Sequence, residues 1–197
     1  MQSASELPND DAARKQARSR LDELVLYVCG RVERPGDLGA VKLQKVFWFS
    51  DCALFARRNK PLTGATYVKG PYGPYSPQIE KSIQRLLKSN RLAEKKSGGQ
   101  RQFFATGQAD VAQFDGEQIA QLDAMIERIV RNFSAATISE ASHDRIWELA
   151  ELGEDLPLSG LFAAQLAEPN IDDLNWAKSC VTPELLAWSE QELQKDR

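Results

Sequence analysis

The chain contains a single histidine, His143, and three cysteines, Cys29, Cys52 and Cys180, so few side chains could act as metal ligands or nucleophiles. The sequence has no Cys-x-x-Cys, His-x-x-x-His or His-Glu-x-x-His spacing, which are the spacings that place ligands around zinc. Ser142 directly precedes His143, and adjacent residues on a helix do not face each other. We therefore expect no enzyme, no cofactor and no metal site, although a nucleophile pair of His143 with Cys29 or Cys52 stays open.

The segment 67–77, YVKGPYGPYSP, favours binding rather than catalysis. Its prolines fix the backbone before anything binds, and they remove the amide N–H groups that a phosphate-binding loop needs. Gly73 supplies a position without a side chain that could clash. Rigid aromatic rings offer contact area at low entropic cost, so we expect Tyr72 and Tyr75 to point partly outward and Tyr67 inward. The alternative is purely structural, with all three rings covering the turn and closing the core.

His143 and Trp147 are four residues apart and can therefore share one face of a helix. In the structural interpretation, the tryptophan is packed and the histidine donates to a backbone carbonyl. In the functional one, both residues line a recognition groove, because aromatic anchors are enriched in interface hot spots. The candidate partner-binding residues are thus Tyr67, Lys69, Tyr72, Gly73, Pro74, Tyr75, His143 and Trp147.

Periodic apolar residues predict the elements that must position these side chains. An amphipathic helix ends near Gly30, and an aromatic-rich helix over 42–55 ends before Pro61. After a short strand at 66–68 and the turn, Ser76-Pro77 predicts an N-cap and the first residue of a helix over 77–89. Further helices are expected after Gly116, around 146–150 and after Thr182. The expected fold class is therefore mainly α (α+β), a compact helical domain with short strands.

The residues 92–106 predict a small β-hairpin around Ser97-Gly98-Gly99. A helix followed by a basic hairpin is the pattern of a winged helix, here in the middle third of the chain. In that interpretation Lys95, Lys96 and Arg101 would contact DNA phosphates and the helix 77–89 would read the groove. A winged fold used only as a scaffold is the alternative. The groove-reading candidates on that helix are Gln78, Gln84 and Arg85.

Charge is unevenly distributed along the 197 residues, although the net charge is only −3. Residues 1–107 contain 19 Lys and Arg against 10 Asp and Glu, whereas residues 108–197 contain 6 against 18. This polarity indicates either a basic face for an anionic partner or two halves that complement each other in the fold.

Composition indicates one domain with accessory ends. Residues 1–16 are expected to be a disordered lead-in, 17–156 one helical domain, and 157–197 an acidic helical C-terminal extension packed on it. No apolar run approaches the roughly 20 residues that span a bilayer, so we expect no membrane association. Three widely separated cysteines favour reduced thiols in a cytoplasmic protein.

Two motifs carry a resemblance to a known family. The order KLQKVFWFSD, KPLTG and a YGP turn resembles the Panacea domain of SocA-like antitoxins, which is often found in phage-associated proteins. The His143 to Trp147 spacing in SHDRIW is similar to that family's second motif. The resemblance spans roughly residues 21–156, the larger part of the chain.

The resemblance implies a function that the residues alone do not. A Panacea domain would act as the antitoxin of a toxin–antitoxin system and neutralise a cognate protein toxin by direct binding. Some members of the family instead present a toxin to a protease, so protease machinery is a second implied partner. Operator DNA would be the partner in the winged-helix alternative, a DNA-binding transcriptional regulator. The sequence is also compatible with a homodimer.

Overall fold

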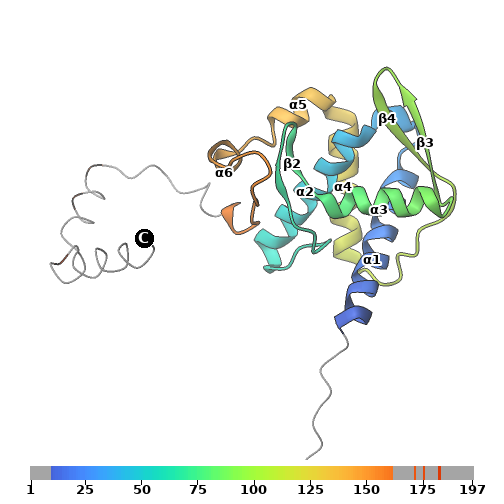
Figure 1. Ribbon diagram of the computed structural model, residues 1–197, viewed down its shortest axis with the longest axis horizontal. Helices are drawn as coiled ribbons and strands as arrows, with labels where there is room; N and C mark the ends of the chain where they lie inside the picture. Colours follow the sequence, from blue (N-terminus) through green and yellow to red (C-terminus); the bar gives the residue numbers. More distant parts are fainter. Residues whose placement is uncertain (1–9, 162–170, 172–174, 176–181, 183–197) are drawn as a thin grey trace, which may run out of the picture. The chain divides into compact units, whose positions relative to one another are not determined.

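The structure, a computed structural model, describes residues 10–161 and the single residues 171, 175 and 182 (Figure 1). The chain divides into two units, 1–164 and 165–197, and every element below lies in the first. Most of the predicted extension 157–197, including the helix expected after Thr182 and the thiol of Cys180, therefore lies outside the described residues.

The described fold is mainly α with two small antiparallel sheets, which confirms the predicted fold class. None of the helices described is long and apolar enough to cross a membrane. In chain order the elements are α1 Asp10–Arg31, the 3-10 helix η1 Pro35–Asp37, α2 Gly39–Arg58, β1 Val68–Gly70, β2 Gly73–Tyr75, α3 Pro77–Lys88, β3 Leu92–Ser97, β4 Gln100–Ala105, α4 Gly116–Asn132, α5 Ala135–Glu140 and α6 Arg145–Leu149.

Helix α2 lies at the centre of the core and contacts α4, α5, β2 and β4 (Figure 1). Its apolar residues Leu43, Phe47 and Leu54 are fully buried, as the helical spacing predicted. The same helix also buries polar side chains, among them Gln44, Lys45 and Asp51. Because buried polar groups need hydrogen-bond partners, these side chains must fix neighbouring segments.

Helix α1 begins at Asp10, within the segment 1–16 that was expected to be a disordered lead-in. Residues 11–19, DAARKQARS, are exposed but rich in strong helix formers such as alanine, arginine, lysine and glutamine. The polar composition of residues 1–16, which lack an apolar stripe, suggested disorder. Their helix propensity instead lets the helix that is buried from Leu21 onward begin earlier, at Asp10.

The basic and acidic halves of the chain contact each other across α4. Arg58 forms ion pairs with Asp115 at 3.2 Å and Glu117 at 2.9 Å, and Arg31 pairs with Asp123 at 3.1 Å. These contacts favour the interpretation in which the two halves complement each other. The pairs are largely exposed, and solvent screens them, so each contributes little to stability.

The turn segment forms a small sheet in which β1 pairs with β2. The strand expected at 66–68 lies at 68–70, and the proline-rich turn itself supplies β2. Pro74 is tolerated there because it stands in an edge strand, where no amide donor is required. On its other side β1 is covered by the residues 153–156, since Leu156 N–H donates to Tyr67 O at 2.7 Å and Lys69 N–H to Glu154 O at 2.8 Å.

Candidate protein-binding site

The candidate site is centred on the turn between β1 and β2. In the sheet Lys69 is opposite Pro74 and Gly70 is opposite Gly73, so that Pro71 and Tyr72 form the tip. Tyr72 is 65% exposed, whereas Gly73 and Pro74 are buried. The turn therefore presents one large aromatic side chain to solvent on a backbone that is packed against the core.

Two polar side chains of α2 hold this backbone in place. The Gln44 amide donates to Ser76 O at 3.3 Å, and its oxygen accepts from Ser76 N–H at 3.0 Å. The Lys45 ammonium donates to Pro74 O at 2.8 Å. All of these groups are buried, so the bonds are shielded from competition with water.

Gly73 allows the close approach between the turn and α2. Its φ is +89°, in the region that favours glycine. A Cβ at this position would lie 2.2 Å from Ser142 Oγ and 2.9 Å from Lys45 Nζ. The turn therefore fits between α2 and the loop after α5 only without a side chain here.

A second polar side chain cluster on α2 anchors the chain before β1. Asp51 accepts hydrogen bonds from Thr63 N–H at 2.8 Å, from the Thr63 hydroxyl, and from Tyr67 O–H at 2.7 Å. Burial raises the pKa of Asp51 while the hydrogen bonds to its carboxylate lower it, and burial beside Asp51 raises the pKa of Tyr67 well above its usual value. Tyr67 thus points inward, as expected, and serves as an anchor rather than a contact surface.

Lys45 carries a testable pH dependence. Burial lowers the pKa of its ammonium from 10.5 to about 7. Between about pH 7 and pH 10.5 Lys45 is therefore deprotonated in the folded state and protonated in the unfolded state. The unfolded state then binds more protons, so the free energy of unfolding should rise with pH in this range, by at most about 1.4 kcal/mol per pH unit. We expect the free energy of unfolding of the wild type, minus that of Lys45→Met, to increase between pH 7.5 and 9.5.

Chemical denaturation of both proteins at several pH values measures this difference. Lys81→Met, a change of the same type on the exposed side of α3, is the control and should show no such slope. A difference between wild type and Lys45→Met that is flat over this window would contradict the prediction.

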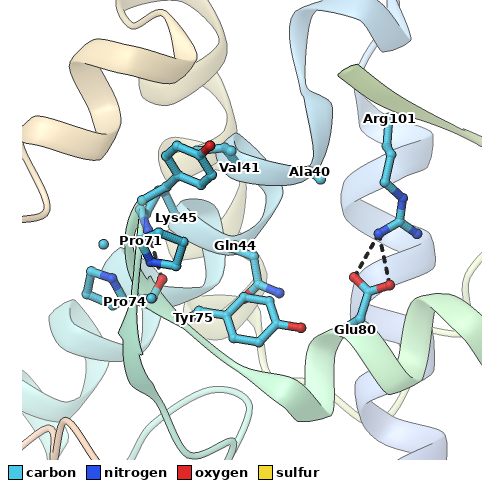
Figure 2. A pocket seen from close by; sticks show the side chains of 12 residues that line it. Ala40, Val41, Gln44, Lys45, Pro71, Pro74, Tyr75, Glu80 and Arg101 are labelled. Carbon is cyan, nitrogen blue, oxygen red and sulfur yellow. Dashed lines mark hydrogen bonds and ion pairs between the residues drawn. The ribbon is translucent and has the colours of Figure 1, made fainter. Parts of the chain in front are cut away.

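A pocket of about 330 Å³ lies beside the turn (Figure 2). The sheet, including Gly70 and Tyr72, forms one side, and Ala40, Val41, Gln44 and Lys45 of α2 form another. At the far end Arg101 pairs with Glu80 at 2.9 Å, and Figure 2 shows the Tyr75 ring reaching from β2 toward this pair. The pocket is therefore mainly apolar, with charged groups at its ends.

His143 and Trp147 lie close together, but not on one helix face as their spacing predicted, because His143 precedes Asp144, the N-cap of α6. Their rings are stacked 3.6 Å apart at an interplanar angle of 3°. The Lys69 ammonium lies 4.2 Å from the centre of the Trp147 ring and donates to Ala150 O at 2.9 Å. Burial and the nearby charges of Lys45 and Lys69 lower the pKa of His143, which favours the neutral form of its ring. Lys69 thus fastens α6 to β1.

The basic residues of the hairpin do not form one cluster. Lys95 and Lys96 are exposed on β3. Arg101 instead pairs with Glu94 at 2.8 Å as well as with Glu80, and lines the pocket. Two of the expected groove-reading side chains are also engaged, because Arg85 pairs with Asp22 at 2.6 Å and Gln84 donates to Glu80 at 2.9 Å.

Sequence reasoning missed the polar residues that support the turn, namely Gln44, Lys45 and Asp51. A signal was present, since Gln44-Lys45 and Asp51 interrupt the apolar face of an otherwise core-forming helix. Such buried polar positions require partners, but the sequence does not say which segment supplies them. The short helix α5, which places Ser142 against Gly73, was also missed.

The fold and the turn define a small helical domain that displays a rigidly held aromatic segment. The family model for the antitoxin SocA-like Panacea domain matches residues 43–148, more than half of the chain. The chain therefore belongs to the SocA-like antitoxin family with a Panacea domain, as the two sequence motifs indicated. The matched span runs from α2 to α6 and includes the whole turn. Comparisons with curated proteins and with solved structures gave no significant match.

Proposed function

We propose that this chain is the antitoxin of a toxin–antitoxin system and that it neutralises a cognate protein toxin by direct binding through the turn 67–77. Family membership supports an antitoxin role in general. The observation that carries the binding mechanism is the 65% exposed Tyr72 on a backbone fixed by Gln44 and Lys45. A ring that is already in position loses little conformational entropy on binding, and this favours a tight complex.

In this mechanism the toxin is blocked by steric occlusion. A side chain of the toxin would enter the pocket beside Tyr72, and Tyr75 and Lys45 would contact it there. We propose binding rather than catalysis also because the described thiols are poor nucleophiles. Burial raises the pKa of Cys29 to about 12 and raises that of Cys52 further, so neither forms a thiolate readily. Buried free thiols fit the reducing cytoplasm, where we place the protein.

Tyr72→Ala should weaken the toxin complex without unfolding the antitoxin. Truncating an exposed aromatic anchor at an interface costs about 2 kcal/mol or more, which corresponds to a 30-fold or larger rise in Kd. The experiment is co-expression with each neighbouring open reading frame, scored for growth rescue and co-purification, followed by titration calorimetry of any complex.

The control is Tyr27→Phe on α1, which changes a tyrosine outside the turn but keeps the ring that packs against the core, and it should leave Kd unchanged. A toxin complex with the same Kd for wild type and Tyr72→Ala would refute the proposed surface. If no neighbouring product is toxic and none is bound, the antitoxin proposal itself fails.

The same proteins and co-expression strains also test two alternatives, a DNA-binding regulator and an adaptor for proteolysis. A DNA-binding regulator requires salt-dependent DNA binding that is lost when Lys95, Lys96 and Arg101 are neutralised. The pairing of Arg101 with two carboxylates makes this alternative the weaker one. An adaptor for proteolysis requires that the toxin disappears faster in cells when the chain is present, whereas a simple blocking antitoxin leaves toxin levels stable.

A further inference from the structure

The exposed large apolar side chains within residues 10–161 lie in two segments that are joined through Lys69. They are Tyr72 at 65%, Leu149 at 74% and Leu152 at 73% exposed. Tyr72 follows Lys69 by three residues in the turn. Leu149 and Leu152 flank Ala150, whose carbonyl accepts the bond from the Lys69 ammonium. Single exposed leucines are ordinary, but several beside one anchoring residue mark a contact surface.

The backbone under Leu149 and Leu152 is firmly held. Gly153 N–H donates to Lys69 O at 2.9 Å, and Lys69 N–H donates to Glu154 O at 2.8 Å. From the other side, the Lys69 ammonium reaches the carbonyls at the C-terminal end of α6, where a positive charge is favourable. The two leucines are therefore presented on an ordered segment joined to the sheet of the turn.

The charge around these leucines is strongly negative. Residues 144–155, DRIWELAELGED, contain five acidic residues and one arginine. The side chains of Glu148, Glu151, Glu154 and Asp155 are exposed. The nearby cation of Lys69 is directed inward, onto the Trp147 ring and the α6 carbonyls. We call Leu149, Leu152 and these four acidic residues the α6 surface.

We infer that the α6 surface is a second part of the partner interface and that it binds a basic, partly apolar surface of another protein. The inference rests on the proposed function, in which a toxin is bound at the adjoining turn. The negative charge of the α6 surface indicates a positively charged partner, because like charges across an interface are costly and opposite charges speed association. In a two-fold dimer through this surface a second copy would present the same carboxylates, and residues 165–197 carry seven Asp and Glu against three Lys and Arg, so neither is complementary to it.

One test needs no identified toxin. Random 12-residue peptides displayed on phage are selected against the full chain and counter-selected against Leu149→Ser/Leu152→Ser. We expect the enriched peptides to carry net positive charge together with large apolar residues. Synthetic copies should bind at least tenfold more weakly at 500 mM than at 50 mM NaCl, because salt screens exposed charges. Glu148→Lys/Glu151→Lys should weaken them by at least the same factor.

The control for net charge is Glu33→Lys/Glu127→Lys, which makes the same charge change at exposed positions after α1 and on α4. It should retain peptide binding within about twofold of the wild type. The inference is overturned if no peptide is enriched or if the enriched peptides are neutral or acidic. It is also overturned if the peptides bind Glu148→Lys/Glu151→Lys as tightly as the control Glu33→Lys/Glu127→Lys. Circular dichroism confirms that each variant is folded.

The toxin experiment separates this inference from the proposed function. A toxin complex that Tyr72→Ala disrupts and Leu149→Ser/Leu152→Ser leaves intact would overturn the inference alone. Peptides that depend on the α6 surface, without any toxin among the neighbouring gene products, would overturn the antitoxin proposal alone. Loss of toxin binding in both variants supports one continuous interface.

Discussion

Gly73→Ala is expected to destabilise the fold by about 3 kcal/mol, since overpacking typically costs about 1–3 kcal/mol and an alanine at positive φ costs about 1 kcal/mol more. The added Cβ would lie 2.2 Å from Ser142 Oγ and 2.9 Å from Lys45 Nζ, and the alanine backbone would have to adopt a φ of +89°. To accommodate the methyl group, the Ser142 hydroxyl and the Lys45 ammonium must be displaced or the turn must move away from α2, and either change disturbs the bond from Lys45 to Pro74. Urea denaturation measures the loss.

Gly64→Ala is the matched control for Gly73→Ala. Gly64 also has a positive φ, +67°, but an added Cβ would have no atom within 4 Å. Its cost should therefore be the backbone strain alone, about 1 kcal/mol. Equal costs at the two positions would show that the close contact with Ser142 and Lys45 does not constrain the turn.

Asp51→Ala should destabilise the protein by about 3 kcal/mol or more, because it leaves three neutral donors without an acceptor and each such group costs about 1 kcal/mol or more. The carboxylate is fully buried and accepts from the Thr63 amide, the Thr63 hydroxyl and the Tyr67 hydroxyl. Removing it leaves these donors without their acceptor in the core and frees the segment that leads into β1. Thermal and urea unfolding measure the effect.

Tyr67→Phe removes a single hydrogen bond from the same cluster and keeps the ring. It should cost about 1 kcal/mol, because the carboxylate retains its bonds from Thr63. The ring itself still packs against Trp48 at 4.9 Å between centroids. A loss in Asp51→Ala as small as that in Tyr67→Phe would mean that water replaces the missing acceptor.

The fold could be predicted largely because apolar periodicity marks helices well. The predicted ends near Gly30 and at Ser76-Pro77 agree with α1 ending at Arg31 and α3 beginning at Pro77. The Ser76 hydroxyl, however, contacts the Gln78 side chain and makes no capping bond. Local signals thus located the boundary of the helix, whereas tertiary contacts decided what the side chain does there.

The position of the turn could be predicted from the sequence, whereas the side chains of α2 that hold it in place could not. Proline and tyrosine density indicated the turn, and the spacing of His143 and Trp147 indicated that they meet. The pairing of α2 with the turn depends on contacts about 30 residues apart, which no local pattern encodes. For the same reason the sequence did not show that Arg101 of the basic hairpin is engaged by carboxylates from both α3 and β3.

The bonds from Gln44 to both backbone groups of Ser76 have a consequence for how any partner can be recognised. A glutamine side chain takes the place of a neighbouring strand at the open edge of β2, Lys45 occupies the Pro74 carbonyl, and Pro74 has no N–H to offer. The residues 153–156 cover the opposite edge. These contacts disfavour extension of this sheet by strand addition, whether by a partner or by a second copy. Recognition at the turn must depend on side chains, whatever the backbone conformation of the bound protein.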